Sequence, residues 1–353
     1  MSHSHTSINL ALKDENDLDN DCIEDVVLSE VHVYKTFTPI EEGNYALSRF
    51  HFTTPHGSPL CNAQKPYTSD KQILKHKENE GLVNYDEDGD MIIPRFENDV
   101  ERNIITIEHT LATPIKSVGT QVWQGSMLLC DFLIHNEKEF DGCIALELGG
   151  GVGLCSIVMA RVAKRVFCTD IRDSLDVCES NKLRNHDIFK YATTDNEVMV
   201  IRELDFFHSS RILDDMDHDH KWTKEDKNDL KRLSVIMASD DKKKHFCFYN
   251  LRVFSIPIVI YDDALTDAFL DTVDKLLVLN PHSAMYISLE KRINFTLEAL
   301  EIVSPAYDYF MNKLEVLTKK NPPSIKIEKL ETNFPQYFKY ERVKELELWK
   351  VYR

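Results

Sequence analysis

The nine residues from Leu146 to Leu154, LELGGGVGL, constrain the fold of this chain more than any other segment. The apolar run Cys143–Leu148 predicts a short buried strand, and apolar residues at helical spacing follow from Leu154 to Val162. Glycines let the backbone turn sharply and let a ligand approach the main chain closely. The segment therefore predicts a strand, a turn and a helix, with a turn that can hold a ligand.

From about residue 103 the sequence alternates between short apolar runs, which predict strands, and apolar positions at helical spacing. This alternation is typical of an α/β fold with a doubly wound, mostly parallel, Rossmann-like sheet. Two final strand patterns have no helical pattern between them and predict an antiparallel C-terminal pair. The expected strands are Ile104–Glu108, Cys143–Leu148, Arg165–Thr169, Val198–Ile201, Val235–Ala238, Ala284–Leu289, Ile325–Leu330 and Leu346–Tyr352, and the helices include Leu175–Asn185, Thr266–Leu279 and Tyr307–Leu317.

Three kinds of nucleotide site begin with a glycine turn after a strand, and the spacing distinguishes them. A phosphate loop ends in Gly-Lys-Ser/Thr, whereas this segment ends in Val-Gly-Leu. A dinucleotide fingerprint needs Gly or Ala three residues after its second glycine. That place is Leu154 if the motif starts at Gly149, and Ser156 if it starts at Gly151. Glu147 followed by the G-x-G-x-G run Gly149–Gly153 instead suits a ligand without a pyrophosphate. We therefore predict S-adenosylmethionine as the cofactor.

Acidic residues at the ends of the next two strands support this prediction. Asp170 ends the second strand, 21 residues after Gly149, where a carboxylate can accept hydrogen bonds from both ribose hydroxyls. Asp205 and Phe206 follow the third strand, where a carboxylate can meet the adenine amino group and an aromatic ring can cover the base.

The fourth strand ends at Ser239-Asp240, and an unusual stretch of 18 residues, 241–258, follows it. Without this stretch the sequence would continue as a compact strand–turn–helix unit through Tyr261. We interpret residues 241–258 as an insertion, with two hypotheses for its origin. It is either a surface loop that bulges out and leaves Asp240 and Tyr261 together, or an artefact of a mistranslated gene model, such as a retained short intron. Sequencing of the transcript would decide between the two.

From about Glu101 to its C-terminus the chain resembles the family-16 protein lysine methyltransferases, which have a seven-strand methyltransferase sheet. Residues 29–58 are also similar, but less closely. The segments that carry the resemblance are Ile107–Pro114, Gln121–Gly125, Leu146–Leu154, Glu203–Asp205, Tyr261–Ala268, Leu289–Thr296 and Glu347–Lys350.

The resemblance implies roles for several residues. Trp123 resembles the tryptophan that packs near the cofactor, Gly149, Gly150 and Gly151 the cofactor loop, and Asp170 the ribose carboxylate. Phe206 departs from the family's tryptophan but keeps an aromatic ring, and Ser239 stands where many relatives carry alanine. The family's acidic-x-x-aromatic motif would be split by the insertion, with Asp240 before it and Tyr261 after it.

The implied reaction is methyl transfer to a lysine side chain of a protein. A lysine amine is almost fully protonated at pH 7, so it has to be deprotonated and aligned before it can attack. We expect Asp240 to orient the amine and Tyr261 to line its channel. Glu290, at the end of the fifth strand, is a weaker candidate for the rim of the pocket.

The N-terminal third of the chain is less regular. Residues 1–28 hold seven acidic residues and one lysine, a composition that predicts a disordered tail. Residues 29–100 read as an extension of short strands and loops, and residues 101–353 as the catalytic domain.

The net charge of −17 suits a lysine-rich protein substrate or serves solubility, and it argues against direct binding of nucleic acid by this chain. The family resemblance implies a basic nuclear protein that binds nucleic acid as the partner. No apolar run is long enough for a membrane span, and residues 1–12 lack a secretion signal. The eight cysteines show no C-x-x-C pair, so no metal is expected. Together these features predict an intracellular protein of the nucleus or cytoplasm.

Other functions stay open on sequence grounds. An NAD-dependent oxidoreductase is disfavoured by the missing third glycine. A protein that binds the cofactor without turnover would follow if the insertion blocks the acceptor pocket, or if the tail and residues 29–100 act as an interaction module. A methyltransferase acting on a non-protein substrate is the third alternative.

Overall fold

The computed structural model describes residues 26–29, 37–40, 45–55, 102–213, 220–240, 262–291, 294–296, 301–319 and 324–353. Residues 1–25, residues 56–100 of the expected extension and the insertion 241–258 lie outside this set. Within the described residues, none of the helices has the length and apolar character that a membrane crossing requires.

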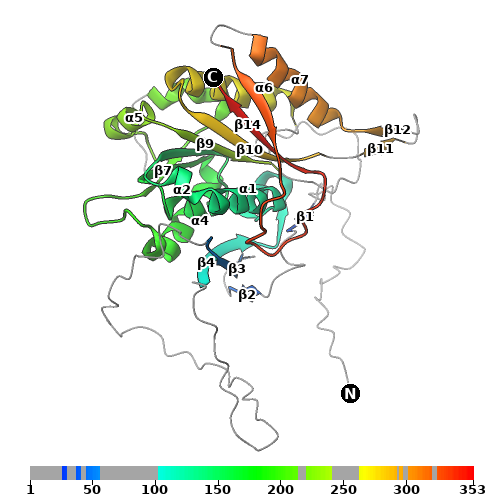
Figure 1. Ribbon diagram of the computed structural model, residues 1–353. Coiled ribbons are helices and arrows are strands. Elements are labelled where there is room, and N and C mark those ends of the chain that lie inside the picture. The colour runs from blue at the N-terminus through cyan, green and yellow to red at the C-terminus, as the bar shows by residue number, and fades with distance from the viewer. Residues whose placement is uncertain are drawn as a thin grey trace, which may run out of the picture.

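A seven-stranded sheet forms the centre of the molecule (Figure 1). Its order is β13-β14-β10-β9-β6-β7-β8, with parallel pairing from β10 through β8 and antiparallel pairing of β14 with β10 and β13. This confirms the predicted doubly wound sheet and its antiparallel C-terminal pair. The strands are β6 (Ile144–Leu148), β7 (Arg165–Asp170), β8 (Met199–Glu203), β9 (Val235–Ser239), β10 (Ala284–Glu290), β13 (Lys326–Leu330) and β14 (Leu346–Tyr352).

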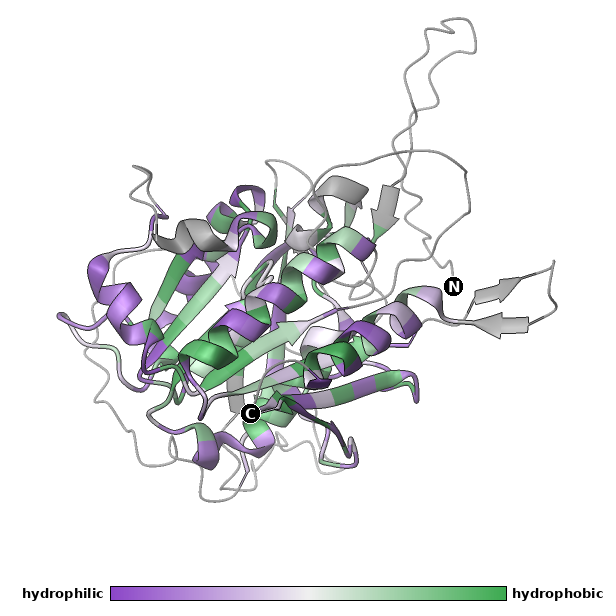
Figure 2. Cartoon of the chain, turned by 90° about the horizontal axis from the view of Figure 1, so that it is seen from above, coloured by the Kyte–Doolittle hydropathy of each residue, from purple (hydrophilic) through white to green (hydrophobic). Residues whose placement is uncertain are grey.

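Helices cover both faces of this sheet, and each face has its own apolar core (Figure 2). Along β6 the side chains alternate, so that Ala145 packs with the first group of helices and Leu146 with the second. The first group is α1 (Gln124–His135), α2 (Glu137–Phe140), α3 (Leu154–Ala160) and α4 (Arg172–Asn185), and the second is α5 (Lys224–Leu230), α6 (Asp263–Leu279) and α7 (Pro305–Lys319). Short elements complete the description: η2 (Ile115–Thr120), η3 (His186–Ile188), η4 (Phe206–Leu213), β11 (Asn294–Thr296) and β12 (Glu301–Val303).

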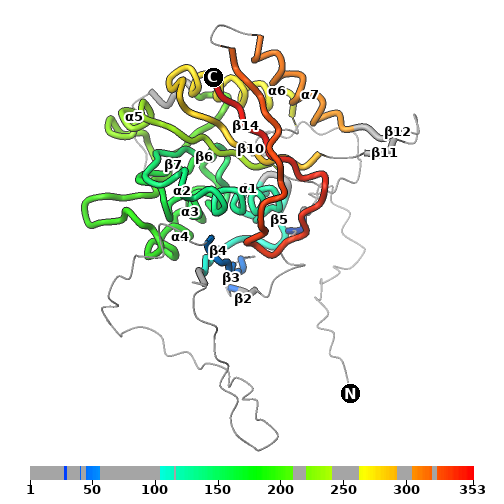
Figure 3. Tube along the Cα trace, viewed as in Figure 1, coloured from blue at the N-terminus to red at the C-terminus, as the bar shows by residue number. Residues whose placement is uncertain are grey.

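The N-terminal extension joins the region of the seven-stranded sheet through a second sheet. Strands β2 (Phe37–Pro39), β3 (Tyr45–Thr53) and β4 (Arg102–Thr110) are antiparallel, and β3 pairs with β4 over all nine residues. This sheet therefore contains strands from both sides of the domain boundary expected at residue 101. Figure 3 shows this sheet beside α1 and α4.

A third pairing corrects the expected extent of the acidic tail. Val26–Leu28 forms strand β1, which pairs antiparallel with β5 (Ala112–Pro114). These three residues fall inside the segment 1–28 that its composition predicted to be disordered. The apolar Val-Val-Leu run has a paired strand partner, which a composition average over 28 residues does not reveal.

The connection between β13 and β14 reaches back across α1. The buried Asp131 carboxylate of α1 accepts hydrogen bonds from the backbone amides of Tyr337 and Phe338, both at 2.8 Å, and from Arg342 at 2.6 Å. Phe338 then stacks on Phe52 of β3, with 5.5 Å between ring centroids. The connection between β13 and β14 thus links α1 to the N-terminal sheet.

Candidate cofactor pocket

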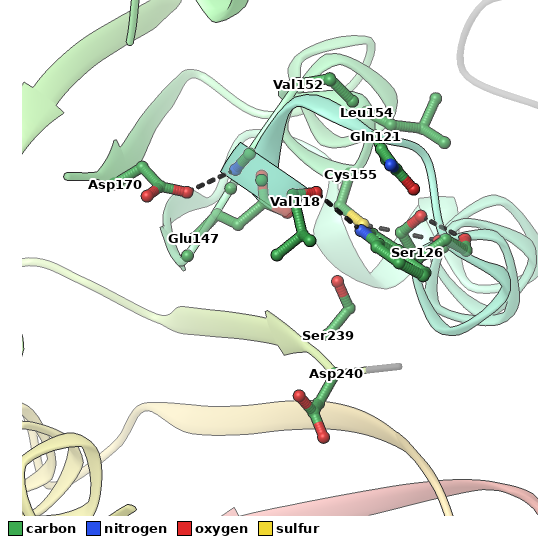
Figure 4. Close-up of a pocket in the computed structure, with 15 residues that line it drawn as sticks. Val118, Gln121, Ser126, Glu147, Val152, Leu154, Cys155, Asp170, Ser239 and Asp240 are labelled. Carbon is green, nitrogen blue, oxygen red and sulfur yellow. Dashed lines mark hydrogen bonds between the residues drawn. The ribbon is translucent and has the colours of Figure 1, made fainter. Parts of the chain in front are cut away.

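A pocket with about 530 Å³ of non-atom space, part of it open to solvent, lies beyond the carboxyl ends of β6, β7 and β9 (Figure 4). Strand β6 has parallel neighbours on both sides, β7 and β9, so the strand order reverses here. Open α/β sheets bind their ligands at such a point. The lining residues are Val118, Gly119, Gln121, Trp123, Ser126, Glu147, Gly149, Gly150, Gly151, Val152, Leu154, Cys155, Asp170, Ser239 and Asp240.

The glycine turn between β6 and α3 needs glycine at two positions for different reasons. Gly149 has φ = 71°, and a Cβ added there would meet no heavy atom within 4 Å, so its open side faces space that a ligand can enter. Gly151 has φ = 53°, and a Cβ there would lie 2.5 Å from the carbonyl oxygen of Gly119. The turn is therefore open at its start and pressed against the opposite wall in its middle.

Asp170 is joined to this turn. Its Oδ2 accepts a hydrogen bond from the Gly151 amide, and its Oδ1 accepts one from the Ile171 amide, both at 2.7 Å. The side chain is buried, and burial raises the pKa of Asp170 to about 6, although the two amide hydrogen bonds lower it. Each carboxylate oxygen has a second lone pair that can accept from a ligand hydroxyl.

Glu147 forms the floor of the pocket. Its Oε2 accepts hydrogen bonds from the backbone amide of Ser156 at 2.9 Å and from the Ser156 hydroxyl at 2.5 Å. Burial raises the pKa of Glu147 to about 7, against the lowering effect of the Ser156 hydroxyl, and the negative charge of Asp170 raises it further. Two buried carboxyl groups with raised pKa values thus belong to one pocket.

The wall opposite the turn comes from the segment before α1. The Trp123 indole donates a hydrogen bond from Nε1 to the Val118 carbonyl at 3.1 Å, and the Ser126 hydroxyl donates to the Trp123 carbonyl at 2.6 Å. Cys155 of α3 contacts the Ser126 carbonyl through its thiol at 3.5 Å. Trp123 is the residue of this wall that the sequence predicted, whereas five further lining residues were not predicted: Val118, Gly119, Gln121, Ser126 and Cys155.

Ser239 and Asp240 end β9 on the side of the pocket near α1. In Figure 4 the Ser239 hydroxyl points towards the glycine turn, whereas the Asp240 carboxyl points the other way. Asp240 is buried, and its amide donates to the Ser288 carbonyl at 2.9 Å. A Cβ added to Gly125 would lie 2.6 Å from the Asp240 carbonyl oxygen, so α1 closes directly on this strand end. Tyr261 lies outside the described residues, and its pairing with Asp240 stays a hypothesis.

Among the described residues, three of the predicted cofactor-binding residues do not line the pocket. Gly153 ends the turn and caps α3. Phe206 packs edge-on against Phe269 of α6, with 5.4 Å between centroids, and so belongs to the core on the other face of the sheet. Asp205 accepts a hydrogen bond from the Phe207 amide and pairs with His208 at 2.6 Å. Cofactor roles for these three stay predictions.

The charges around the pocket fit the predicted ligand better than a phosphate. Its charged lining residues, Glu147, Asp170 and Asp240, are all acidic, and the lining contains no lysine, arginine or histidine among the described residues. A pyrophosphate would need cationic or clustered amide donors, whereas a sulfonium, an ammonium and ribose hydroxyls are complementary to carboxylates. S-adenosylmethionine carries those three groups, so the residues present suit it.

Comparison with known proteins agrees with this geometry. The sequence profile of a family described as "Lysine methyltransferase" matches residues 101–218. Human methyltransferase-like protein 22 is 36% identical over 278 residues, which cover 74% of this chain and 62% of that protein. Mouse protein N-lysine methyltransferase METTL21A is 38% identical over 64 residues, or 18% of this chain and 29% of that protein.

The chain spans about three fifths of the length of the human relative. Among solved structures, a putative methyltransferase from Streptococcus mutans aligns at 10% identity and a TM-score of 0.33, over 61% of this chain and 94% of that chain. The strand order of this chain itself defines its fold.

Proposed function

Because this chain is a relative of methyltransferase-like protein 22 and carries a domain of the lysine methyltransferase family at residues 101–218, we propose that it is an S-adenosylmethionine-dependent protein-lysine N-methyltransferase. The observation that carries the proposal is the pocket at the reversal of strand order, in which a glycine turn faces charged residues that, among those the structure describes, are all acidic. A cationic nucleoside is the ligand class that this combination favours.

When bound, S-adenosylmethionine supplies a methyl group activated by its positively charged sulfur. We assign the ribose hydroxyls to Asp170, whose oxygens sit at the end of β7, and the amino acid portion to the turn Gly149–Gly151 and to Glu147. The Trp123 ring and the Ser239 hydroxyl would complete the wall and the floor. Roles in holding adenine are retained as predictions for Asp205 and Phe206.

The acceptor side of the site has to turn a lysine ammonium into a neutral, aligned amine. Burial of that amine lowers its pKa because the charged form loses its hydration. Asp240 is buried at the end of β9 and carries the charge that attracts a lysine side chain. We propose that Asp240 orients the amine and that Tyr261 lines the channel. Glu290, also buried, ends the neighbouring strand β10 and remains a weaker candidate for the rim.

The partner proposed is a protein with an accessible lysine, in particular a basic nuclear protein that binds nucleic acid. The net charge of −17 supports this choice, since it attracts a basic surface and repels a nucleic-acid backbone. We place the reaction in the nucleus or cytoplasm. The five cysteines among the described residues are all free thiols, which suits a reducing compartment.

The proposal is tested by methyl transfer. The full chain is incubated with S-adenosylmethionine that carries a tritiated methyl group and with a fraction of basic nuclear proteins from cells in which methylation has been inhibited. Acid hydrolysis of the labelled protein should release Nε-methyl-lysine, and the Asp170→Ala variant should release at least tenfold less. Label on another amino acid or on nucleic acid would contradict the proposal. Cofactor binding without any transfer would favour the non-catalytic alternative.

A further inference from the structure

Asn181 is a fully buried polar residue of α4 that connects the cofactor turn to the N-terminal sheet. Its Oδ1 accepts a hydrogen bond from the Glu108 amide of β4 at 2.6 Å, and its Nδ2 donates to the Glu108 carbonyl at 2.9 Å. The same Nδ2 donates its second hydrogen to the Val152 carbonyl at 2.9 Å. Both donors of the amide are therefore used, and its orientation is fixed because the Glu108 amide can only donate.

The contact with Val152 controls one peptide plane of the turn. The Val152 carbonyl and the Gly153 amide belong to the same planar peptide unit, so they cannot rotate independently. The Gly153 amide donates to the Gly150 carbonyl at 2.8 Å and closes the turn Gly150–Gly153. Asn181 on one side and Gly150 on the other thus hold this plane between them. Gly150, Gly151 and Val152 all line the pocket, so the plane sets part of its wall.

We propose that Asn181 is a positioning residue for the cofactor: it fixes the Val152–Gly153 peptide and thereby holds the glycine turn in its binding shape. The proposal rests on the proposed function, since it concerns the site assigned to S-adenosylmethionine. Without Asn181 the buried Val152 carbonyl lacks this donor. An unsatisfied buried carbonyl is unfavourable, and rotation of the peptide to relieve it would break the Gly153–Gly150 hydrogen bond.

The next turn of the same helix offers a matched control. Asn185, also buried, accepts from the Thr106 amide of β4 at 2.9 Å and donates to the Thr106 carbonyl at 2.8 Å. Its remaining hydrogen goes to the Asn181 backbone carbonyl within α4, at 2.7 Å, and not to the glycine turn. Asn181 and Asn185 therefore hold β4 in the same way, and Asn181 alone of the two contacts the cofactor turn.

The test is calorimetric titration of the full chain with S-adenosylhomocysteine, using the wild type, Asn181→Ala and Asn185→Ala. We expect the Kd of Asn181→Ala to rise about tenfold, which corresponds to one buried hydrogen bond, and that of Asn185→Ala to stay within about twofold of the wild type. Native-state hydrogen exchange supplies a second readout, in which the Gly153 amide should exchange faster in Asn181→Ala and at the wild-type rate in Asn185→Ala.

Equal affinities of Asn181→Ala and wild type would overturn the proposal, and so would equal losses in the two variants, because the second result would assign the effect to the support of β4. A wild type that fails to bind S-adenosylhomocysteine would overturn the proposed function itself, and this result is distinguishable from the other two. If Asn181→Ala does not fold, the milder pair Asn181→Ser and Asn185→Ser is compared by the same two measurements.

Discussion

The carboxylate of Asp170 accepts a hydrogen bond from the Gly151 amide at 2.7 Å, so the acidic end of β7 and the glycine turn after β6 form one unit. Replacing this carboxylate removes both the hydrogen bond to the glycine turn and the proposed acceptor for the ribose hydroxyls. We expect Asp170→Ala to weaken binding of S-adenosylhomocysteine at least tenfold, measured by calorimetry. Asp173, which is exposed in the first turn of α4, provides the control, and Asp173→Ala should bind like the wild type.

The stability of the cofactor-free protein should depend on pH through Glu147. Its pKa is raised from 4.5 to about 7 in the folded state, so the folded protein binds more protons than the unfolded chain between those values. Stability from this group is therefore fully present below pH 4.5 and is lost as the pH rises towards 7. Asp170, whose pKa is raised to about 6, acts in the same direction.

Glu147→Gln should flatten this dependence, since glutamine keeps a similar shape without titrating. Chemical unfolding at pH 5, 6 and 7 measures this dependence. Between pH 5 and pH 7 the free energy of unfolding of the wild type should fall by on the order of 2 kcal/mol more than that of the variant. If both proteins show the same slope across that range, Glu147 is not the group responsible.

Two glycines of the turn should respond differently to the same substitution. Gly151→Ala places a methyl group 2.5 Å from the Gly119 carbonyl oxygen, so the opposite wall has to move, and we expect a loss of about 3 kcal/mol in unfolding free energy. Gly149→Ala meets no atom within 4 Å and should lose only about 1 kcal/mol, from its positive φ. The new methyl group would instead occupy space that the ligand needs. Gly149→Ala should therefore cost more in the free energy of cofactor binding than in the free energy of unfolding.

Asp131 and Arg342 anchor the connection between β13 and β14, and neither residue lines the cofactor pocket. The Asp131 side chain is completely buried and the Arg342 side chain is 14% exposed, so Asp131→Ala leaves a nearly buried guanidinium without this carboxylate. We expect a loss of about 3 kcal/mol in the free energy of unfolding, measured in urea. The backbone amides of Tyr337 and Phe338 donate hydrogen bonds to the Asp131 carboxylate, so their hydrogens should exchange faster with solvent in Asp131→Ala. Arg232→Ala, at an exposed ion pair, should change stability by less than about 0.5 kcal/mol.

Phe206 separates a cofactor role from a packing role. Its ring contacts Phe269 within the core beneath α6, so Phe206→Ala should lower stability by about 3 kcal/mol. If packing is its main role, cofactor affinity at a temperature where the variant is fully folded should fall less than threefold. A tenfold loss of affinity with little loss of stability would instead support stacking on adenine.

The parts of the fold that follow periodic patterns were predictable from the sequence. The strand–turn–helix at Leu146–Leu154 and the final antiparallel pair are local patterns, and the structure confirms both. The strand-end position of Asp170 beside the glycine turn also follows from parallel topology, because the carboxyl ends of neighbouring strands meet at one edge.

Other features depend on contacts between distant segments. The wall residue Gly119 shows its importance only when it approaches Gly151, and Asn181 has no special sequence context beyond an ordinary helix. Phe206 follows a strand end as expected, yet its ring turns into the core, because α6 brings Phe269 against it. Strand β1 depends on pairing with β5, which no local pattern reports.

The most direct test of the central claim is titration of the full chain with S-adenosylhomocysteine and, separately, with NAD⁺. The lining carboxylates suit the ribose hydroxyls and the ammonium group that S-adenosylhomocysteine shares with the cofactor, and the described lining residues offer no cation to a pyrophosphate. We therefore predict binding of S-adenosylhomocysteine at one site per chain and no detectable binding of NAD⁺. Binding of NAD⁺ without binding of S-adenosylhomocysteine would contradict the account, because the pocket would then be accepting a pyrophosphate.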